Sequence, residues 1–305
     1  MDKCRPNYVT LQEAQSPVVL RGATEGWTGM NFVKDLRAAE LLTTWRVHPH
    51  GSISVWESEC FFLDASLGHF YEWERTIPGA DLSEGNPFTP FDREGHWAYA
   101  DYKHIKELAG DRLDILGSLV NWRDLGCDKG VGDSTFWLGS EGSHTPLHHD
   151  TYGVNLVAQL HGTKRWTLYP PGDTDSLYPT RVPYEESSVF SQVDVRKPDL
   201  TRQAGPMVIT LTAGDALYVP KHWWHFVEAE ETSLSVNVWR NAPGDDNDRA
   251  REAIARVLVT SLAEGLAGEI GPSWLNPTEE IWPLGETLAV AEAAFQRLGV
   301  TGKCE

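Results

Sequence analysis

The sequence contains few cysteines, and they form no pattern that could fix a fold. The four are Cys4, Cys60, Cys127 and Cys304, which stand far apart without a CxxC pair. This spacing argues against a zinc finger and against a disulfide scaffold. We therefore expect reduced, unpaired thiols in an intracellular protein.

A long apolar run is missing as well. No stretch approaches the roughly 18 apolar residues that a membrane-spanning helix needs. The opening residues, MDKCRPNYVTLQEA, lack the apolar centre of a secretory signal. We expect a cytoplasmic protein without a membrane partner, and the nucleus is the alternative location.

Positive charge is scarce. Lys and Arg number 26 against 44 Asp and Glu, so the formal net charge is −18. Such a balance repels phosphate backbones, and no Lys/Arg run offsets it, which argues against nucleic acid as a partner. It favours instead a neutral or basic substrate segment.

Aromatic residues, by contrast, are abundant. The chain holds 13 Trp, 10 Phe and 9 Tyr, enough apolar surface to build a core and to argue against disorder. The length of 305 residues fits one large domain or two small ones.

The middle of the chain carries a series of short β patterns. Apolar or alternating runs are separated by Gly, Pro and Asp turns, which favours a mainly β fold, a double-sheet barrel or jelly roll. The expected strands are residues 134–138, 154–160, 164–169, 207–211, 216–219 and 233–239.

The two ends of the chain differ from the middle in their pattern of apolar residues. We divide the sequence into an N-terminal strand and helix segment (1–94), a β core (95–241) and a C-terminal helical segment (242–305). The helical spacing of apolar residues after position 242 supports the last division. Before the core we expect strands at 17–21 and 45–48, a helix at 31–42 and a loop over 75–96, and at the start of the core a helix at 99–108.

Residues 143–150, SHTPLHHD, are the richest in metal-ligating side chains. Side chains alternate along a strand, so His148 and Asp150 would point to one side and His149 to the other. The third ligand must come from elsewhere, and the run 214–225 offers two histidines, His222 and His225. His225 follows Asp150 by 75 residues, which leaves room for the strands between them. A single histidine is more often structural than a ligand, so the prediction rests on the combination. Two histidines and one carboxylate with open positions form the facial triad of non-haem Fe(II) oxygenases.

Four motifs together resemble the Jumonji C domain of the cupin superfamily. They are Thr-Pro-x-His-x-Asp at 145–150, Lys after a Gly turn at 162–164, Pro-x-x-Trp-Trp-His at 220–225 and Asn-x-Trp at 237–239. The resemblance covers residues 95–241 well, is weaker before them and is weakest in the tail. It extends to the asparaginyl hydroxylases of the family and to members that associate with a small heat-shock protein. It implies a double-stranded β-helix.

The resemblance also implies cofactors. It implies that His148, Asp150 and His225 bind Fe(II), with 2-oxoglutarate and O2 as cosubstrates. Lys164 and Thr145 match the family positions that bind the far carboxylate of 2-oxoglutarate. Without the resemblance, Lys164 would be read as a solvated turn lysine and Thr145 as an ordinary strand hydroxyl.

The resemblance also covers further residues, most of them outside the four motifs. Asn155 and Asn237 match positions near the iron and the inner carboxylate, and an Asn in an apolar strand must be hydrogen-bonded or costs roughly 1–3 kcal/mol. Tyr99 matches a tyrosine that reaches the far carboxylate, although Tyr102 competes for that role. Trp137 stands where the family often has an aliphatic pocket residue.

The remaining histidines and tryptophans of these motifs have more ordinary interpretations. His149 and His222 are expected to be structural or to support the ligands, and His144 is a candidate for lining the site entrance. We expect Trp223, Trp224 and Trp239 to pack the barrel and to fix the triad.

The resemblance favours a dioxygenase that hydroxylates a protein or peptide side chain. Three alternatives stay open: an N-methyl demethylase with the same chemistry, an interaction protein that binds a small heat-shock protein with weak or no catalysis, and a cupin with another metal. The helical tail could also form a homodimer.

Overall fold

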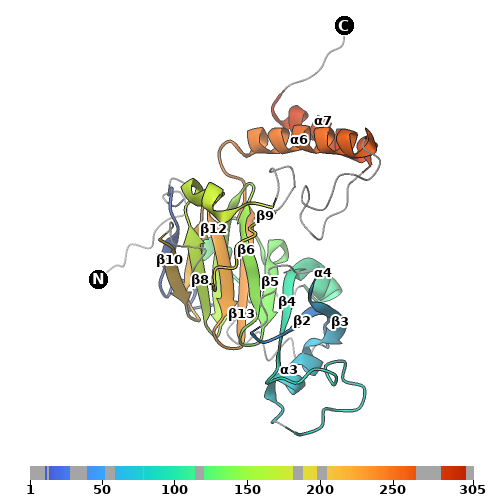
Figure 1. The fold of residues 1–305 in the computed structure, drawn as a ribbon. Coiled ribbons are helices and arrows are strands. Elements are labelled where there is room, and N and C mark those ends of the chain that lie inside the picture. Colours follow the sequence, from blue (N-terminus) through green and yellow to red (C-terminus); the bar gives the residue numbers. More distant parts are fainter. Residues whose placement is uncertain are drawn as a thin grey trace, which may run out of the picture.

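The protein consists mainly of two antiparallel β-sheets (Figure 1). The structure is a computed structural model that describes residues 11, 14–27, 40–51, 59–77, 79–113, 120–180, 188–197, 205–265 and 283–299. The two-sheet arrangement confirms the predicted mainly β, jelly-roll class. The larger sheet has the order β1 (Val18–Leu20), β11 (Ala216–Val219), β7 (Val154–His161), β13 (Ser233–Arg240), β5 (Thr135–Gly139), β4 (His96–His104), β2 (Leu42–Pro49) and β3 (Phe61–Ser66). The smaller sheet has the order β10 (Met207–Leu211), β8 (Lys164–Tyr169), β12 (Trp224–Ala229), β6 (His144–Asp150) and β9 (Ser188–Phe190).

The six strands expected in the core all form, with bounds that shift by at most one residue. Their alternating or wholly apolar sequences suit strands that are covered on one or both faces. β7, for example, is buried at every residue except His161. The sequence interpretation overlooked the central strand β12, the edge strands β3 and β9 and the helix α3 (Leu67–Arg75).

The helix expected over 99–108 is wrong in its first part. Residues up to His104 belong to β4, and only α4 (Ile105–Ala109) is helical. β4 lies between two partners, with Tyr99 opposite Arg46 of β2 and opposite Gly139 of β5. Because β4 pairs with a strand on each edge, its backbone is extended whatever the helix or strand preference of its own residues.

The helix expected over 31–42 falls mostly outside the described residues. Its last residue, Leu42, instead begins β2 and pairs with Ser66 of β3. The strands of the N-terminal segment thus extend the larger sheet on both sides, β1 beside β11 and β2 beside β4. The proposed boundaries at 94 and 241 stay a prediction.

Two helices follow β13 in the part of the chain that the structure describes. α6 (Asp245–Gly265) and α7 (Leu284–Arg297) pack against each other beyond one end of the sheets (Figure 1). Ala250, Ala253, Ala291 and Ala294 form their contact. Among the described residues, no helix has both the length and the apolarity to span a membrane.

A tight turn joins β7 to β8 and brings Lys164 to the start of its strand. Gly162 adopts φ +64°, and a Cβ there would lie 2.2 Å from the carbonyl oxygen of Thr232. Gly85 has a similar φ of +82° but has no atom within 4 Å of the same position. It is therefore a control that has the unfavourable backbone without the clash.

We expect Gly162→Ala to lower the free energy of unfolding more than Gly85→Ala. Both changes should cost about 1–2 kcal/mol for a left-handed alanine. Gly162→Ala should cost roughly 1–3 kcal/mol more for the overlap with Thr232. Urea denaturation of the two variants measures the difference, and equal losses would contradict the close approach at this turn.

Candidate metal centre and anion pocket

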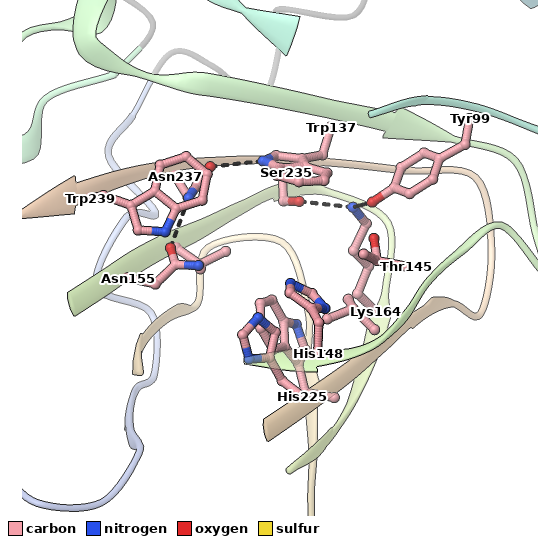
Figure 2. Close-up of a pocket in the computed structure, with 13 residues that line it drawn as sticks. Tyr99, Trp137, Thr145, His148, Asn155, Lys164, His225, Ser235, Asn237 and Trp239 are labelled. Atoms are coloured by element: carbon pink, nitrogen blue, oxygen red, sulfur yellow. Dashed lines mark hydrogen bonds between the residues drawn. The ribbon is translucent and has the colours of Figure 1, made fainter. Parts of the chain in front are cut away.

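A cavity lies between the two sheets (Figure 2). β4, β5, β7 and β13 of the larger sheet form one wall, and β6, β8 and β12 of the smaller sheet form the other. Its lining residues are Tyr99, Trp137, Thr145, His148, Asn155, Val157, Lys164, Trp166, His225, Val227, Ser235, Asn237 and Trp239.

The three predicted metal ligands come together at this cavity. β6 and β12 pair antiparallel with His225 opposite His148, and the two ring centroids are 4.2 Å apart. One ligand atom from each of His148, Asp150 and His225 lies within 4.8 Å of the others, and all three residues are buried. Among the described residues, no other group of His, Cys, Asp or Glu meets this criterion.

Backbone carbonyls orient both histidines in the same way. Nδ1 of His148 lies 2.8 Å from the oxygen of Pro146, and Nδ1 of His225 lies 2.9 Å from the oxygen of Trp223. A proton on each Nδ1 makes these contacts hydrogen bonds and leaves each Nε2 lone pair for a metal. Burial, with His148 nearby, lowers the pKa of His225 to about 4, so this ring is neutral as a ligand must be.

A chain of hydrogen bonds fixes the carboxylate of Asp150. Trp137 Nε1 donates to Asn237 Oδ1 at 2.7 Å, and Asn237 Nδ2 donates to Asn155 Oδ1 at 2.8 Å (Figure 2). Asn155 Nδ2 and Trp239 Nε1 then donate to Asp150 Oδ2, at 3.5 Å and 3.0 Å. These bonds use Oδ2 and leave Oδ1 available for a metal.

The other end of the cavity holds a buried cation. Lys164 is 2% exposed, and its ammonium donates to Tyr99 Oη at 3.1 Å and to Ser235 Oγ at 2.9 Å (Figure 2). Burial lowers the pKa of Lys164 to about 7. Lys164 is therefore buried, not the solvated turn lysine of the alternative interpretation.

The residues present fit a bound dianion and a metal. Among the described residues, no carboxylate lies within 4.0 Å of Lys164 Nζ, so its charge has no direct partner. The indole N–H of Trp166, another wall residue, is buried without a hydrogen-bond acceptor. An uncompensated cation and an unsatisfied donor are costly in an empty interior. The Lys164 end of the cavity therefore suits an anionic oxygen ligand, and the His–Asp–His end suits a divalent metal.

The structure distinguishes the two tyrosines that compete for the pocket. Tyr99 is buried and its hydroxyl contacts Lys164. Tyr102 is 50% exposed and has a φ of +51°, where the pairing of β4 with β5 is irregular. Its ring packs against the rings of Trp137 and Trp239, at centroid distances of 5.9 and 5.7 Å. Tyr99 thus lies at the anion end, and Tyr102 lies outside the aromatic wall.

The other histidines of these motifs lie away from the cavity. The ring of His149 meets Trp224 edge-on at 4.5 Å, and His222 Nε2 contacts the carbonyl of Thr151. His144 is buried between Trp97 and Phe226 and does not line the cavity. Burial lowers the pKa of His144 and of His149 to about 4, so both rings are neutral core residues.

The tryptophans of the motifs hold the strands around the triad. Trp224 is fully buried and donates to Thr174 Oγ1 at 2.9 Å. Trp223 donates to the carbonyl of Gln15 at 2.9 Å while its own carbonyl contacts His225. Trp239 differs, because it also lines the cavity and hydrogen-bonds Asp150 directly.

Sequence reasoning missed several wall residues. Ser235 contacts Lys164, and Trp166, Val157 and Val227 complete the wall. Ser235 stands two residues before Asn237 on β13, so strand alternation from the Asn-x-Trp motif could have placed it on the same face. Nothing in the local sequence of the other three separates them from ordinary core residues.

Comparisons with known proteins agree with this geometry. HSPB1-associated protein 1 of Rattus norvegicus is 41% identical over 261 residues, which cover 83% of this chain and 53% of that protein. The HSPB1-associated protein 1 homolog of Danio rerio is 38% identical over 281 residues, 88% of this chain and 62% of that protein. The chain thus spans a little over half the length of these relatives.

A more distant relative is named as a demethylase. Lysine-specific demethylase JMJ31 of Arabidopsis thaliana is 33% identical over 171 residues, 52% of this chain and 30% of that protein. The sequence profile of the cupin-like domain family matches residues 92–246, about half of the chain. The chain therefore belongs to the cupin-like family of Jumonji C domains.

Proposed function

We propose that this chain is an Fe(II)- and 2-oxoglutarate-dependent dioxygenase that hydroxylates a protein side chain. One observation carries the proposal: the buried His148–Asp150–His225 group and a buried Lys164 held by hydroxyls meet at one cavity, which His148, His225 and Lys164 line. A facial triad with open positions suits non-haem iron. A cation at the far end suits a dicarboxylate that also chelates that iron.

Iron, 2-oxoglutarate and O2 supply the oxidation of a C–H bond, with succinate and CO2 as products. The protein supplies position and a dry pocket. His148, Asp150 and His225 would hold Fe(II), each oriented by the hydrogen bonds described above. Because Trp239 and Asn155 occupy Oδ2 of Asp150, the carboxylate is fixed before the metal binds.

Lys164, Tyr99, Ser235 and Thr145 would hold the far carboxylate of 2-oxoglutarate. Their hydroxyls and the ammonium form a polar end in a wall that is otherwise rich in Val and Trp. Asn155 and Asn237 are proposed to lie near the inner carboxylate, and their amides also connect Trp137 to Asp150.

Hydroxylation of a protein side chain is preferred over N-demethylation. The formal net charge of −18 suits a neutral or basic protein segment. Demethylation is the second candidate because a relative carries the name lysine-specific demethylase.

The names of the similar proteins suggest a partner. Relatives called HSPB1-associated protein 1 cover most of this chain. We propose a small heat-shock protein as a partner or substrate, in the cytoplasm or the nucleus. Binding with weak or no catalysis is the alternative, against which the complete triad and the buried Lys164 argue.

Metal-dependent binding of 2-oxoglutarate is the first expected result. Anaerobic protein with Mn(II), which replaces iron without turnover, should unfold about 2–6 °C higher when 2-oxoglutarate is at about 100 times its Kd. His148→Ala and Lys164→Ala should each abolish the rise. Differential scanning calorimetry measures it.

His149→Gln is the matched control, because His149 neighbours the ligand His148 but faces Trp224. It should keep the rise even if its own unfolding temperature falls. Bound metal without any rise would favour a cupin with other chemistry. If the unaltered protein neither binds the metal nor shows a higher unfolding temperature, the result would favour an interaction protein without catalysis.

Affinity for 2-oxoglutarate should fall as the pH rises above 7. Burial lowers the pKa of free Lys164 to about 7, and a bound carboxylate favours the charged form and so raises that pKa. Affinity is then constant below about pH 7 and falls by up to about tenfold per pH unit above it. Calorimetric titration with Mn(II) between pH 7 and 9 measures the slope. A flat profile, or the same slope in Lys164→Met, would contradict the assignment.

Mass spectrometry of products separates the two enzyme candidates. A peptide substrate incubated with Fe(II), 2-oxoglutarate and O2 should gain one oxygen atom without release of formaldehyde. Formaldehyde and the loss of a methyl group from a methylated peptide would establish demethylation instead. The triad variant His225→Ala is the control for both readouts.

We also propose a homodimer through the C-terminal helices. Ile254, Leu258 and Leu262 recur at intervals of four on α6 and are 46%, 59% and 45% exposed. Light scattering should give about twice the chain mass of 34.1 kDa, and Leu258→Glu should return it to the monomer value. Leu42→Glu, at an exposed leucine of β2 (67%) outside the C-terminal helices, is the matched control that should leave the dimer intact. A monomer mass at high concentration would refute the dimer.

A further inference from the structure

A buried ion pair lies close to the Lys164 end of the cavity but does not line it. Arg46 of β2 and Asp101 of β4 are joined at 2.7 Å, with side chains only 4% and 10% exposed. Arg46 Nη2 also donates to the backbone oxygen of His144 on β6, at 3.1 Å. The guanidinium thus connects the larger sheet to the smaller one at this point.

Tyr99 joins this pair to Lys164. The guanidinium of Arg46 lies 5.5 Å from the centroid of the Tyr99 ring, and the ammonium of Lys164 lies 5.1 Å from the same centroid. The hydroxyl of Tyr99 meanwhile contacts Lys164 Nζ. Two cations therefore lie around one aromatic ring, and only Arg46 has a carboxylate beside it.

Asp101 is the acidic group that acts on Lys164 among the described residues. Its negative charge favours the protonated ammonium, against the effect of burial. If this charge were not balanced, it would partly neutralise Lys164 and repel an arriving carboxylate. Because Arg46 lies 2.7 Å away, the pair is neutral as a unit, and the charge of Lys164 stays available.

We propose that Arg46 is a positioning residue for the cosubstrate: by pairing with Asp101, it keeps the Lys164 ammonium free to bind the far carboxylate of 2-oxoglutarate. The inference rests on the proposed function and adds to it a residue that does not touch the ligand. It gives the buried pair Arg46 and Asp101 an electrostatic role in cosubstrate binding in addition to its place in the core.

Three variants test the proposal by calorimetric titration of 2-oxoglutarate into anaerobic, Mn(II)-loaded protein. The titrations are run at about pH 6, below the pKa of about 7 of Lys164, so that loss of the Asp101 charge does not itself deprotonate the ammonium. Arg46→Gln should weaken binding about tenfold, because Asp101 is then an unbalanced charge near Lys164. Asp101→Asn should bind at least as tightly as the unaltered protein. The double variant Arg46→Gln/Asp101→Asn should return to within about twofold of it.

Asp101→Asn and the double variant keep the test decisive if Arg46→Gln fails to fold. A merely structural role predicts weaker binding in both of them, and that result would overturn the proposal. Arg165→Gln removes a cation of β8 whose side chain is 44% exposed and paired with Glu228, so it should leave the affinity unchanged.

A second ligand separates this proposal from other causes. 2-Oxobutyrate has the keto acid that chelates the metal but lacks the far carboxylate. Its affinity should be the same in all variants, and a parallel loss would show that Arg46 acts on the metal centre instead. If the unaltered protein binds Mn(II) but not 2-oxoglutarate, the proposed function itself fails, which is a distinct result.

Discussion

The pairing of β6 with β12 is the constraint on which the candidate site depends. It sets His225 opposite His148 and leaves Asp150 on the same side as His148. A slip of β12 by one residue in this register would turn His225 to the other face of the sheet, away from His148 and Asp150. β8 and β9 flank the pair and hold it in place, so the register is fixed from both edges.

Burial of polar groups gives the site its precision. The line from Trp137 through Asn237 and Asn155 to Asp150 crosses four strands, and every member is hydrogen-bonded to the next. A buried amide without partners would cost roughly 1–3 kcal/mol, so the network holds the carboxylate in one orientation. Lys164 is the exception, because its charge has hydroxyl partners only. The imbalance is what makes this end of the cavity suited to an anion.

The N-terminal strands contribute more than an edge to the sheet. β2 carries Arg46 and β4 carries Tyr99 and Asp101, so the anion end is built partly from residues that precede the metal-binding strands. β1 covers β11 at the opposite edge, where Val19 packs on the cluster that includes Trp166 and Val227. The double-sheet core and its extension therefore form one structure around the cavity.

The sequence by itself determined the mainly β class and most strands of the core. With the motifs of the Jumonji C domain, it also determined the group His148, Asp150 and His225. Alternation has a fixed period along a strand, so residues 148 and 150 had to share a face wherever the strand lay. The tertiary structure decided what depends on pairing across long distances in the chain. It made residues 99–104 extended where a helix was expected, because β2 and β5 hold β4 on both edges. It buried Lys164, brought Ser235 to it and joined Arg46 to Asp101. No local pattern encodes those contacts, because each depends on which strands become neighbours in the folded sheets.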